Sequence, residues 1–241
     1  MSFVGGVGYS NIDLIYSGLD RLPDKGEEIF ARGFSMQFGG GIPATMINLS
    51  RLGVESRIIT FAGHDLFSEF VKKTLNSYPV KTVNLYKGNK MPVVLSSTLL
   101  YCGDRSFISY TDGMDLNDAV MDEVYENLKG AYVVDMHVGF LDVYKRLKKD
   151  GCIQIFDTGW EDDLTLEKYR DYLEIADYYI PNQKEAMKIT GTSSVEAAAD
   201  VLSEFFSDVT IKMDKEGCLL KNKDGIKIIS SVQNVKAIDA T

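Results

Sequence analysis

The segment YVVDMHVGFLDVYKRLKKDGCIQIF, residues 132–156, contains one complete strand–helix–strand unit. Its ends, residues 132–135 and 153–156, are short apolar runs of the kind found in buried strands. Residues 141–149 between them have the pattern of a helix. Two strands joined through a single helix run parallel in one sheet, so the segment predicts an α/β fold with helices covering a parallel sheet.

The same alternation of strand and helix extends through most of the chain. We expect strands at residues 3–9, 12–17, 57–61, 178–180 and 209–212, and helices at residues 43–52, 66–75, 166–176, 184–190 and 195–206. Three segments instead predict hairpins: residues 28–38 with a bend at Gly33, residues 93–110 with a turn at 102–105, and residues 218–230 around Asp224-Gly225. The early hairpins interrupt the α/β pattern, so they predict a small sub-sheet beside the mostly parallel sheet.

The charge balance argues against nucleic acid and membrane partners. The 241 residues include 26 Lys and Arg against 35 Asp and Glu, a formal net charge of −9. Binding to nucleic acid or to an anionic membrane depends on an excess of Lys and Arg, so neither partner is expected. No apolar run approaches the ~20 residues that a membrane span needs. These features predict a soluble globular protein.

The cysteines and histidines restrict the chemistry further. Cys102, Cys152 and Cys218 are odd in number and far apart, which fits neither a disulfide framework nor a paired metal motif. We therefore expect a reducing, cytoplasmic compartment. His64 and His137 are the two histidines of the chain, too few for a His-rich zinc site.

The common nucleotide-binding and hydrolase motifs are missing from the sequence. Gly6-x-Gly8 follows a predicted strand but lacks the third glycine and the helix that cradle a dinucleotide. No G-x-x-x-x-G-K-[ST] loop, nucleophile elbow or H-E-x-x-H motif occurs. A NAD-linked oxidoreductase and a P-loop enzyme are accordingly disfavoured.

Two early motifs are candidates for holding a polar ligand. Asn11-Ile12-Asp13 places an amide and a carboxylate on the same face of a strand, a combination that suits neighbouring sugar hydroxyls. An Asx-turn between two strands explains the same residues. Gly39-Gly40-Gly41 precedes the predicted helix near Pro43. It either admits a ligand close to helix amides or connects the sub-sheet to the main sheet.

Two later features follow predicted strands. In Pro181-Asn182-Gln183-Lys184-Glu185, the residues Asn182 and Glu185 suit a capping box at the start of a helix. They also stand at the carboxyl end of a parallel strand, where α/β proteins bind ligands, and there they could hold hydrated Mg²⁺ near a phosphate. His137 follows the strand at residues 132–135, where it either faces a ligand or is a hydrogen-bonded structural histidine.

Taken together, these motifs resemble the PfkB carbohydrate kinase family, the ribokinase-like sugar kinases. Six motifs occur in the family's order: Asn11-Ile12-Asp13, Gly39-Gly40 with Arg51-Leu52-Gly53, Gly63-His64-Asp65, residues 181–185, residues 211–217 and Asp239-Ala240-Thr241. The resemblance implies an α/β, ribokinase-like three-layer sandwich with a mostly parallel central sheet and a small β-sheet lid. It also implies a single kinase-type domain over residues 1–241, with the lid at about residues 12–38 and 91–111.

The resemblance implies ATP-dependent phosphorylation of a sugar or sugar-like hydroxyl, and it implies roles for individual residues. The expected substrate contacts are Asn11, Asp13, Gly39, Gly40 and His137, and the expected contacts with the nucleotide phosphates are Asn182, Glu185 and Lys212. Glu185 is expected to hold Mg²⁺ through water, and Asp239 and Thr241 match family positions that bind a monovalent cation such as K⁺.

Three departures from the family pattern affect these expectations. Ala44 or Thr45 stands where the family often has an Asn that touches the sugar, and Asp214 replaces a glycine of the nucleotide loop. The sequence stops at Thr241, before the G-A-G-D residues that supply the family's anion hole and aspartate base. We therefore expect a truncated fold with no catalytic base within residues 1–241 and an inactive chain.

The resemblance also bears on partners. The family's lid often pairs with a second copy, and apolar Phe34, Met36 and Phe38 on a predicted exposed sheet fit such an interface, so we expect a homodimer. The alternative is a non-catalytic sugar- or nucleotide-binding protein on the same fold.

Overall fold

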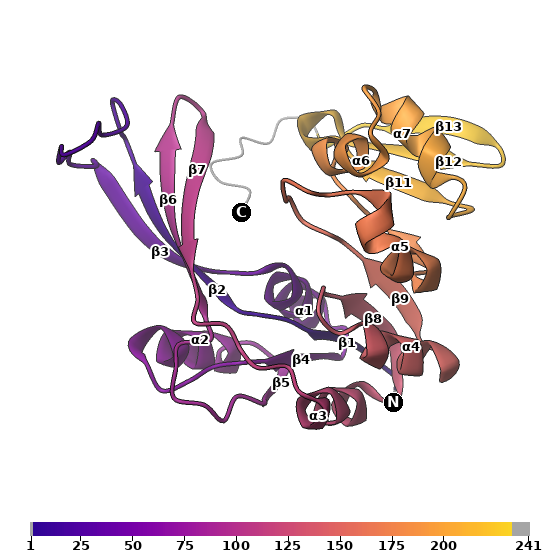
Figure 1. The fold of residues 1–241 in the computed structure, drawn as a ribbon, viewed down its shortest axis with the longest axis horizontal. Helices are drawn as coiled ribbons and strands as arrows, with labels where there is room; N and C mark the ends of the chain where they lie inside the picture. Colours follow the sequence, from indigo (N-terminus) through magenta and orange to yellow (C-terminus); the bar gives the residue numbers. More distant parts are fainter. Residues whose placement is uncertain (1, 233–241) are drawn as a thin grey trace. The chain divides into compact units, whose positions relative to one another are not determined.

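The computed structural model describes residues 2–232, and the chain divides into two compact units, Phe3–Asn127 (unit 1) and Leu128–Thr241 (unit 2). The elements that begin in unit 1 are β1 (Phe3–Val7), β2 (Asn11–Ser17), β3 (Gly33–Gly39), α1 (Gly41–Arg51), β4 (Ser56–Thr60), α2 (Leu66–Asn76), β5 (Lys81–Asn84), β6 (Val94–Tyr101), β7 (Asp104–Tyr110) and α3 (Asp118–Leu128) (Figure 1). The elements of unit 2 are β8 (Ala131–Met136), α4 (Leu141–Lys149), β9 (Ile153–Phe156), α5 (Leu166–Ile175), β10 (Tyr178–Tyr179), α6 (Gln183–Thr190), α7 (Val195–Leu202), β11 (Val209–Lys212), β12 (Cys218–Asn222) and β13 (Gly225–Ile229). None of the helices in residues 2–232 has the length and apolar character needed to cross a bilayer.

Unit 1 is built on three parallel strands, β1, β4 and β5, which pair in the order β1-β4-β5. Helix α1 packs against β1 and β4. The core of unit 1 is apolar and almost fully buried, and it includes Met46 of α1, Ile58 of β4, and Val71 and Leu75 of α2. Burying each such side chain stabilises the fold by about 1.5–3 kcal/mol.

A second, four-stranded sheet in unit 1, here called the small sheet, has the order β3-β2-β6-β7 (Figure 1). Strand β2 runs antiparallel to β3 and parallel to β6, and β6 runs antiparallel to β7. Directly paired residues share a face of a sheet, which gives the small sheet two unlike faces. The polar face carries Asn11, Asp13, Gln37, Gly39, Ser96 and Ser109, and the apolar face carries Ile12, Leu14, Phe34, Met36, Phe38, Leu95 and Ile108.

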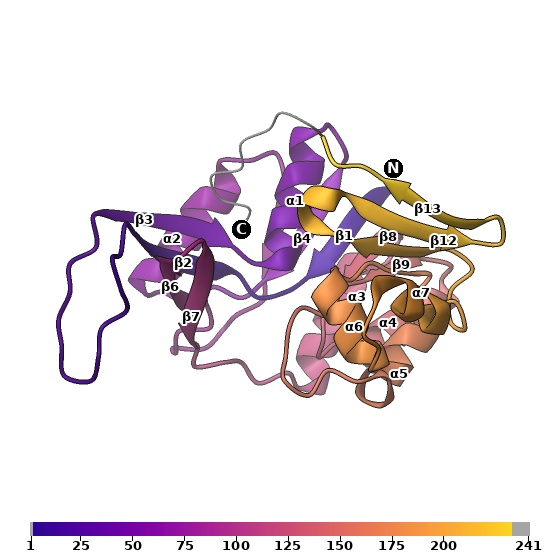
Figure 2. The same ribbon diagram turned by 90° about the horizontal axis from the view of Figure 1, so that it is seen from above.

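Unit 2 contains the parallel strands β8, β9 and β10 and a separate antiparallel sheet, β11-β12-β13. Helices α4 and α5 pack against β9. An aromatic cluster joins α5 to the strands, with Phe156 stacked on Tyr172 at a centroid distance of 5.2 Å. Helices α6 and α7 lie against each other and against β11 (Figure 2).

The periodicity of the sequence predicted most of these elements. Helix α4 and strands β9 and β11 have the predicted bounds, and the hairpins at residues 93–110 and 218–230 are confirmed as β6–β7 and β12–β13. Helix α2 begins at the predicted residue, where Asp65 caps it by accepting hydrogen bonds from the backbone nitrogens of Phe67 and Ser68.

Two predictions about elements were wrong, and one strand was not predicted. Residues 28–38 do not form a hairpin: Gly33 is the first residue of β3, which pairs with β2, and residues 28–32 contain no strand. Strand β5 was missed because its four residues, KTVN, form a short and partly exposed edge strand with little apolar signal. Helix α7 ends at Leu202, and residues 203–205 continue as a turn, although the apolar spacing continues to Phe206.

Candidate functional site

The first group of predicted site residues lies on β2 in unit 1. Asn11 and Asp13 point to the polar face of the small sheet, because alternate residues of a strand share a face. The Asn11 amide nitrogen Nδ2 donates a hydrogen bond of 3.0 Å to Asp13 Oδ1. Asp13 is only 6% exposed, so burial and this bond hold its carboxylate in place. Both residues lie within an extended strand, which removes the Asx-turn alternative.

The double glycine leaves room around the Asp13 carboxylate. Gly39 pairs with Asn11 across β3 and β2, and a Cβ atom at Gly39 would lie 2.6 Å from Asp13 Oδ2. Gly40 has a φ of 104°, a left-handed conformation that side chains rarely adopt. A Cβ atom there would lie 2.9 Å from the backbone oxygen of Tyr9. Gly39 therefore leaves space beside the carboxylate, and Gly40 lets the chain turn into α1.

Helix α1 begins directly after the double glycine. Within residues 2–232, no side chain caps its N-terminus, so its first amides remain available to an oxygen-bearing ligand. Thr45 Oγ1 donates to the backbone oxygen of Gly41 at 3.1 Å, and Ala44 has no polar side chain. Neither residue offers the amide that the family often presents at this point of the helix.

The second group of predicted residues lies in unit 2, where β10 leads into α6. Asn182 Oδ1 accepts a hydrogen bond of 3.0 Å from the backbone nitrogen of Glu185. Glu185 Oε2 in turn accepts one of 2.8 Å from the backbone nitrogen of Asn182. The capping box is therefore confirmed. It uses one of the two carboxylate oxygens of Glu185 and fixes the direction of that side chain.

Lys212 lies next to this turn. Its backbone nitrogen donates to the oxygen of Pro181 at 2.9 Å, and Asn182 and Lys212 form an isolated parallel bridge. The Lys212 side chain donates to Asp157 Oδ2 at 2.7 Å. The structure thus brings the three predicted residues Asn182, Glu185 and Lys212 together at the carboxyl ends of neighbouring strands.

Asp157 is a site residue that the sequence reasoning missed. It directly follows β9, so it occupies the carboxyl end of a parallel strand, and this position was visible in the sequence. What the sequence did not show is that Asp157 would pair with Lys212, which is 55 residues away.

The electrostatic environment of Glu185 is set mainly by burial. The side chain is 5% exposed, and burial raises the pKa of its carboxyl. The nearby carboxylate of Asp157 raises the pKa further, whereas the hydrogen bond from the Asn182 backbone and the Lys212 ammonium lower it. A cation that approached Glu185 and Asp157 together would relieve the repulsion between their charges.

The donor set of this cluster fits hydrated Mg²⁺. Mg²⁺ usually keeps several waters and binds through one or two carboxylates together with phosphate oxygens. Glu185 and Asp157 supply two carboxylates, and Lys212 supplies a positive charge for phosphate. Across residues 2–232 no three His, Cys, Asp or Glu side chains are grouped to hold a metal ion by themselves.

His137 lies at the end of β8 in unit 2. Its ring nitrogen Nδ1 lies 2.8 Å from the backbone oxygen of Val138, and its backbone nitrogen donates to Tyr144 Oη at 2.8 Å. A carbonyl oxygen accepts only, so Nδ1 carries the hydrogen. Burial lowers the pKa of His137, which keeps the ring neutral at pH 7. These bonds give the residue a structural role and leave its expected substrate contact as a prediction.

Asp239 and Thr241, the expected ligands of a monovalent cation, lie outside the described residues. The structure therefore brings together Asn11, Asp13, Gly39 and Gly40 in unit 1, and Asn182, Glu185 and Lys212 in unit 2.

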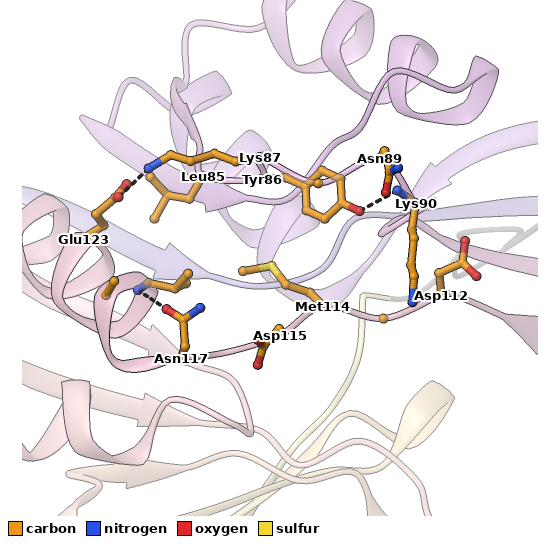
Figure 3. Close-up of a pocket in the computed structure, with 14 residues that line it drawn as sticks. Leu85, Tyr86, Lys87, Asn89, Lys90, Asp112, Met114, Asp115, Asn117 and Glu123 are labelled. Atoms are coloured by element: carbon orange, nitrogen blue, oxygen red, sulfur yellow. Dashed lines mark hydrogen bonds and ion pairs between the residues drawn. The ribbon is translucent and has the colours of Figure 1, made fainter.

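The structure also contains a cavity of about 650 Å³ in unit 1 that includes none of the predicted site residues (Figure 3). Its walls come from residues 85–90, residues 112–115 and the first half of α3. Three of its charged groups have partners: Lys87 pairs with Glu123, and Asp112 accepts hydrogen bonds from Tyr110 and the backbone of Met91.

Comparison with known proteins finds sugar kinases among the proteins that resemble this chain. A family model described as pfkB family carbohydrate kinase matches residues 1–241. A protein of Pyrococcus horikoshii named as a sugar kinase is 26% identical over 221 residues, which cover 84% of this chain and 68% of that protein. The ribokinase of Lactococcus lactis is 20% identical over 247 residues, covering 100% of this chain and 79% of the relative.

Solved structures share the fold. The ribokinase of Arabidopsis thaliana, complexed with ribose and ATP, superposes with a TM-score of 0.78 at 21% identity, covering 100% of this chain and 82% of the other. The ribokinase of Giardia lamblia gives a TM-score of 0.82 at 18% identity, covering 99% and 77%. The fold is therefore ribokinase-like, an α/β fold with a mostly parallel central sheet and a small additional sheet, as the sequence predicted.

Proposed function

Because the chain belongs to the pfkB family of carbohydrate kinases, we propose that it takes part in the ATP-dependent phosphorylation of a hydroxyl group on a small sugar. The observation that carries this proposal is the Asn11–Asp13 pair beside Gly39. A carboxylate accepts hydrogens from hydroxyl groups and an amide nitrogen donates to their oxygens, so the pair can hold two adjacent hydroxyls of one sugar. Burial fixes the pair before the sugar arrives, which lowers the entropy cost of binding.

We assign the substrate side to unit 1. Asp13 and Asn11 orient the sugar hydroxyls, Gly39 adds no side chain beside the carboxylate, and Gly40 brings the amides at the start of α1 close to the sugar. We also propose that His137, which directly follows β8, contacts the substrate, as the family resemblance implies.

We assign the nucleotide side to unit 2. When bound, Mg²⁺ would neutralise charge on the phosphates of ATP, which is its usual part in phosphoryl transfer. Glu185 and Asp157 would hold the water ligands of that ion through their carboxylates. Lys212 would balance the negative charge of the phosphates, and Asn182 would keep Glu185 in position through the capping box. The contacts of Asp239 and Thr241 with K⁺ stay predictions.

We also propose a homodimer formed through the apolar face of the small sheet, and a cytoplasmic location. Phe34 and Ile108 are 61% and 72% exposed on that face, and Met36 is 40% exposed. An exposed apolar patch of this kind is typical of protein–protein contacts. Phe38 contributes less, since it packs against the core of unit 1. The location rests on Cys102, Cys152 and Cys218, all of which are free thiols.

The proposal is tested first by binding, which depends directly on Asn11, Asp13 and Gly39. Isothermal titration calorimetry of the chain against D-ribose, D-fructose and D-glucosamine should detect at least one sugar, and Asp13→Ala should abolish its binding. Asp104→Ala, which removes an exposed carboxylate from the same sheet, is the matched control and should bind normally. Equal binding by Asp13→Ala and the native chain would refute the substrate assignment. Sugar-dependent release of ADP from ATP would then identify a kinase and exclude the alternative, a non-catalytic sugar- or nucleotide-binding protein.

A further inference from the structure

Four polar side chains form a continuous hydrogen-bonded chain across the polar face of the small sheet. Asn11 Nδ2 lies 3.0 Å from Asp13 Oδ1, Ser96 Oγ lies 3.2 Å from Asn11 Oδ1, and Ser109 Oγ lies 2.8 Å from Ser96 Oγ. The strand register explains the alignment, because Asp13 pairs with Ser96 and Ser96 pairs with Ser109. The chain therefore runs from buried Asp13 on β2, through β6, to β7.

The chemistry of the groups fixes the direction of every bond. A carboxylate only accepts hydrogen bonds, so the amide nitrogen of Asn11 must face Asp13 and its oxygen must face Ser96. That amide oxygen also only accepts, so the Ser96 hydroxyl donates to it. A serine hydroxyl has one hydrogen, and Ser96 has used it. In the contact between the two serines, the donor is therefore Ser109.

Because the hydrogen bonds run in this direction, Ser109 can bind a ligand only as a hydrogen-bond acceptor. Its hydrogen is committed to Ser96, so its oxygen can offer only lone pairs to a ligand. The side chain is exposed, unlike Ser96, which is 4% exposed. Bonds in such a chain polarise one another, and the Asp13 carboxylate at its end makes every donor point toward it. A ligand beside Ser109 thus meets an acceptor.

We propose that Ser109 is a specificity-determining residue that selects sugars carrying a hydroxyl or amino hydrogen directed at β7. The inference rests on the proposed function and narrows its substrate class. A deoxy carbon, an ether oxygen or a phosphate oxygen at this point would not donate to the serine oxygen, so such a sugar would bind more weakly by the contribution of one neutral hydrogen bond. The substrates that fit are neutral polyhydroxylated sugars and amino sugars, in preference to sugars that present a phosphate to this face.

The test compares Ser109→Ala with Ser106→Ala. Ser106 is on the same strand, but it pairs with Leu99 on the opposite face, so it serves as a matched control. Ser109→Thr keeps the hydroxyl and should restore binding. Calorimetric titrations would use D-ribose, D-fructose and D-glucosamine, each with its monodeoxy and mono-O-methyl analogues, against the native chain, these three variants and Asp13→Ala.

For a sugar that the native chain binds, we expect Ser109→Ala to lower affinity by about threefold to tenfold, the range that one neutral hydrogen bond contributes. Ser106→Ala and Ser109→Thr should bind as the native chain does. The loss should disappear for the one analogue that lacks the hydrogen facing Ser109. If Asp13→Ala abolishes binding while Ser109→Ala matches the native chain for every sugar, the inference is overturned and the proposed function stands. If Asp13→Ala binds normally, or no sugar binds the native chain, the proposed function fails and the inference fails with it.

Discussion

Replacing Gly39 by alanine tests the substrate site with a single methyl group. The new Cβ atom would lie 2.6 Å from Asp13 Oδ2, closer than a side-chain carbon can approach an oxygen without displacing it. Gly39 does not have a left-handed backbone, so alanine introduces no strain in β3 itself. The substitution therefore acts on the Asp13 carboxylate and on little else.

The size of the effect follows from the bond that the carboxylate makes. To reach ordinary contact, Oδ2 must retreat by about 0.5–1 Å. This shift disturbs the 3.0 Å bond between Asp13 Oδ1 and Asn11 Nδ2. A hydrogen bond from a sugar hydroxyl to the carboxylate contributes about 1.5–3 kcal/mol, and a displaced Asp13 no longer makes it, so sugar affinity should fall about tenfold to hundredfold. Alanine also restricts the unfolded chain, which stabilises by about 0.4–1 kcal/mol and offsets part of the loss of the bond between Asp13 and Asn11, so the free energy of unfolding should fall by at most about 2.6 kcal/mol.

The other end of β3 provides the control. A Cβ atom at Gly33 would lie 2.5 Å from Ser17 Oγ, a single hydroxyl that can rotate away at little cost. Gly33→Ala should therefore retain sugar binding. The assays are calorimetric titration with the sugar that the native chain binds best and urea unfolding followed by circular dichroism. If Gly39→Ala binds sugar as tightly as Gly33→Ala, Asp13 does not contact the sugar and the reasoning is refuted.

Three further predictions concern unit 2 and the apolar face. Glu185→Gln keeps an acceptor for the capping box but removes a charge, so calorimetry should show at least about tenfold weaker ATP binding in Mg²⁺ with no change in its absence. Burial raises the pKa of Glu185, so this carboxyl stabilises the fold below its ordinary pKa of 4.5 and loses that contribution as pH rises through the raised value. Glu185→Gln should therefore have a higher Tm than the native chain at pH 7, and the difference in Tm should disappear near pH 4.5. A difference in Tm that does not change with pH would contradict this. Lys212→Met should weaken ATP binding about threefold to tenfold, measured by the fluorescence of the single tryptophan, Trp160. The control is Lys148→Met, which removes a comparable ion pair of 2.6 Å with Asp177 and should leave ATP binding unchanged. Ile108→Glu should convert a dimer to a monomer in light scattering, whereas Ser35→Glu on the opposite face should not; a native chain that is already monomeric would refute the proposed interface.

Local sequence patterns predicted the geometry of site residues correctly wherever a single strand or a single helix terminus determines it. Alternation along β2 predicted that Asn11 and Asp13 share a face, and the three-residue spacing of Asn182 and Glu185 predicted the capping box. In both cases the partner lies two or three residues away. The backbone conformation of one element then fixes the contact, whatever the rest of the chain does.

The sequence did not predict contacts of site residues whose hydrogen-bond or ion-pair partner lies on another strand. Ser96 and Ser109 join the site only through the register of β2, β6 and β7, which no local pattern specifies. The pairing of Asp157 with Lys212 likewise depends on which strands become neighbours. The wrong hairpin at residues 28–38 has the same origin. Period-2 alternation continued through residues 28–32, but β2 offers a partner only from Gly33 onwards.

Glu185 shows that a structural and a functional interpretation of one residue need not compete. The capping box uses Oε2, which accepts the backbone hydrogen of Asn182, and it leaves the other oxygen outside that bond. The cap therefore does for Glu185 what packing does for Asp13: it holds a buried carboxylate in one orientation, so that less entropy is lost when a ligand binds. Burial without a partner would be costly for a carboxylate, and the raised pKa of Glu185 records that cost. A site that keeps such a carboxylate gains when a cation binds, because the same burial that disfavours the lone charge strengthens its attraction to Mg²⁺.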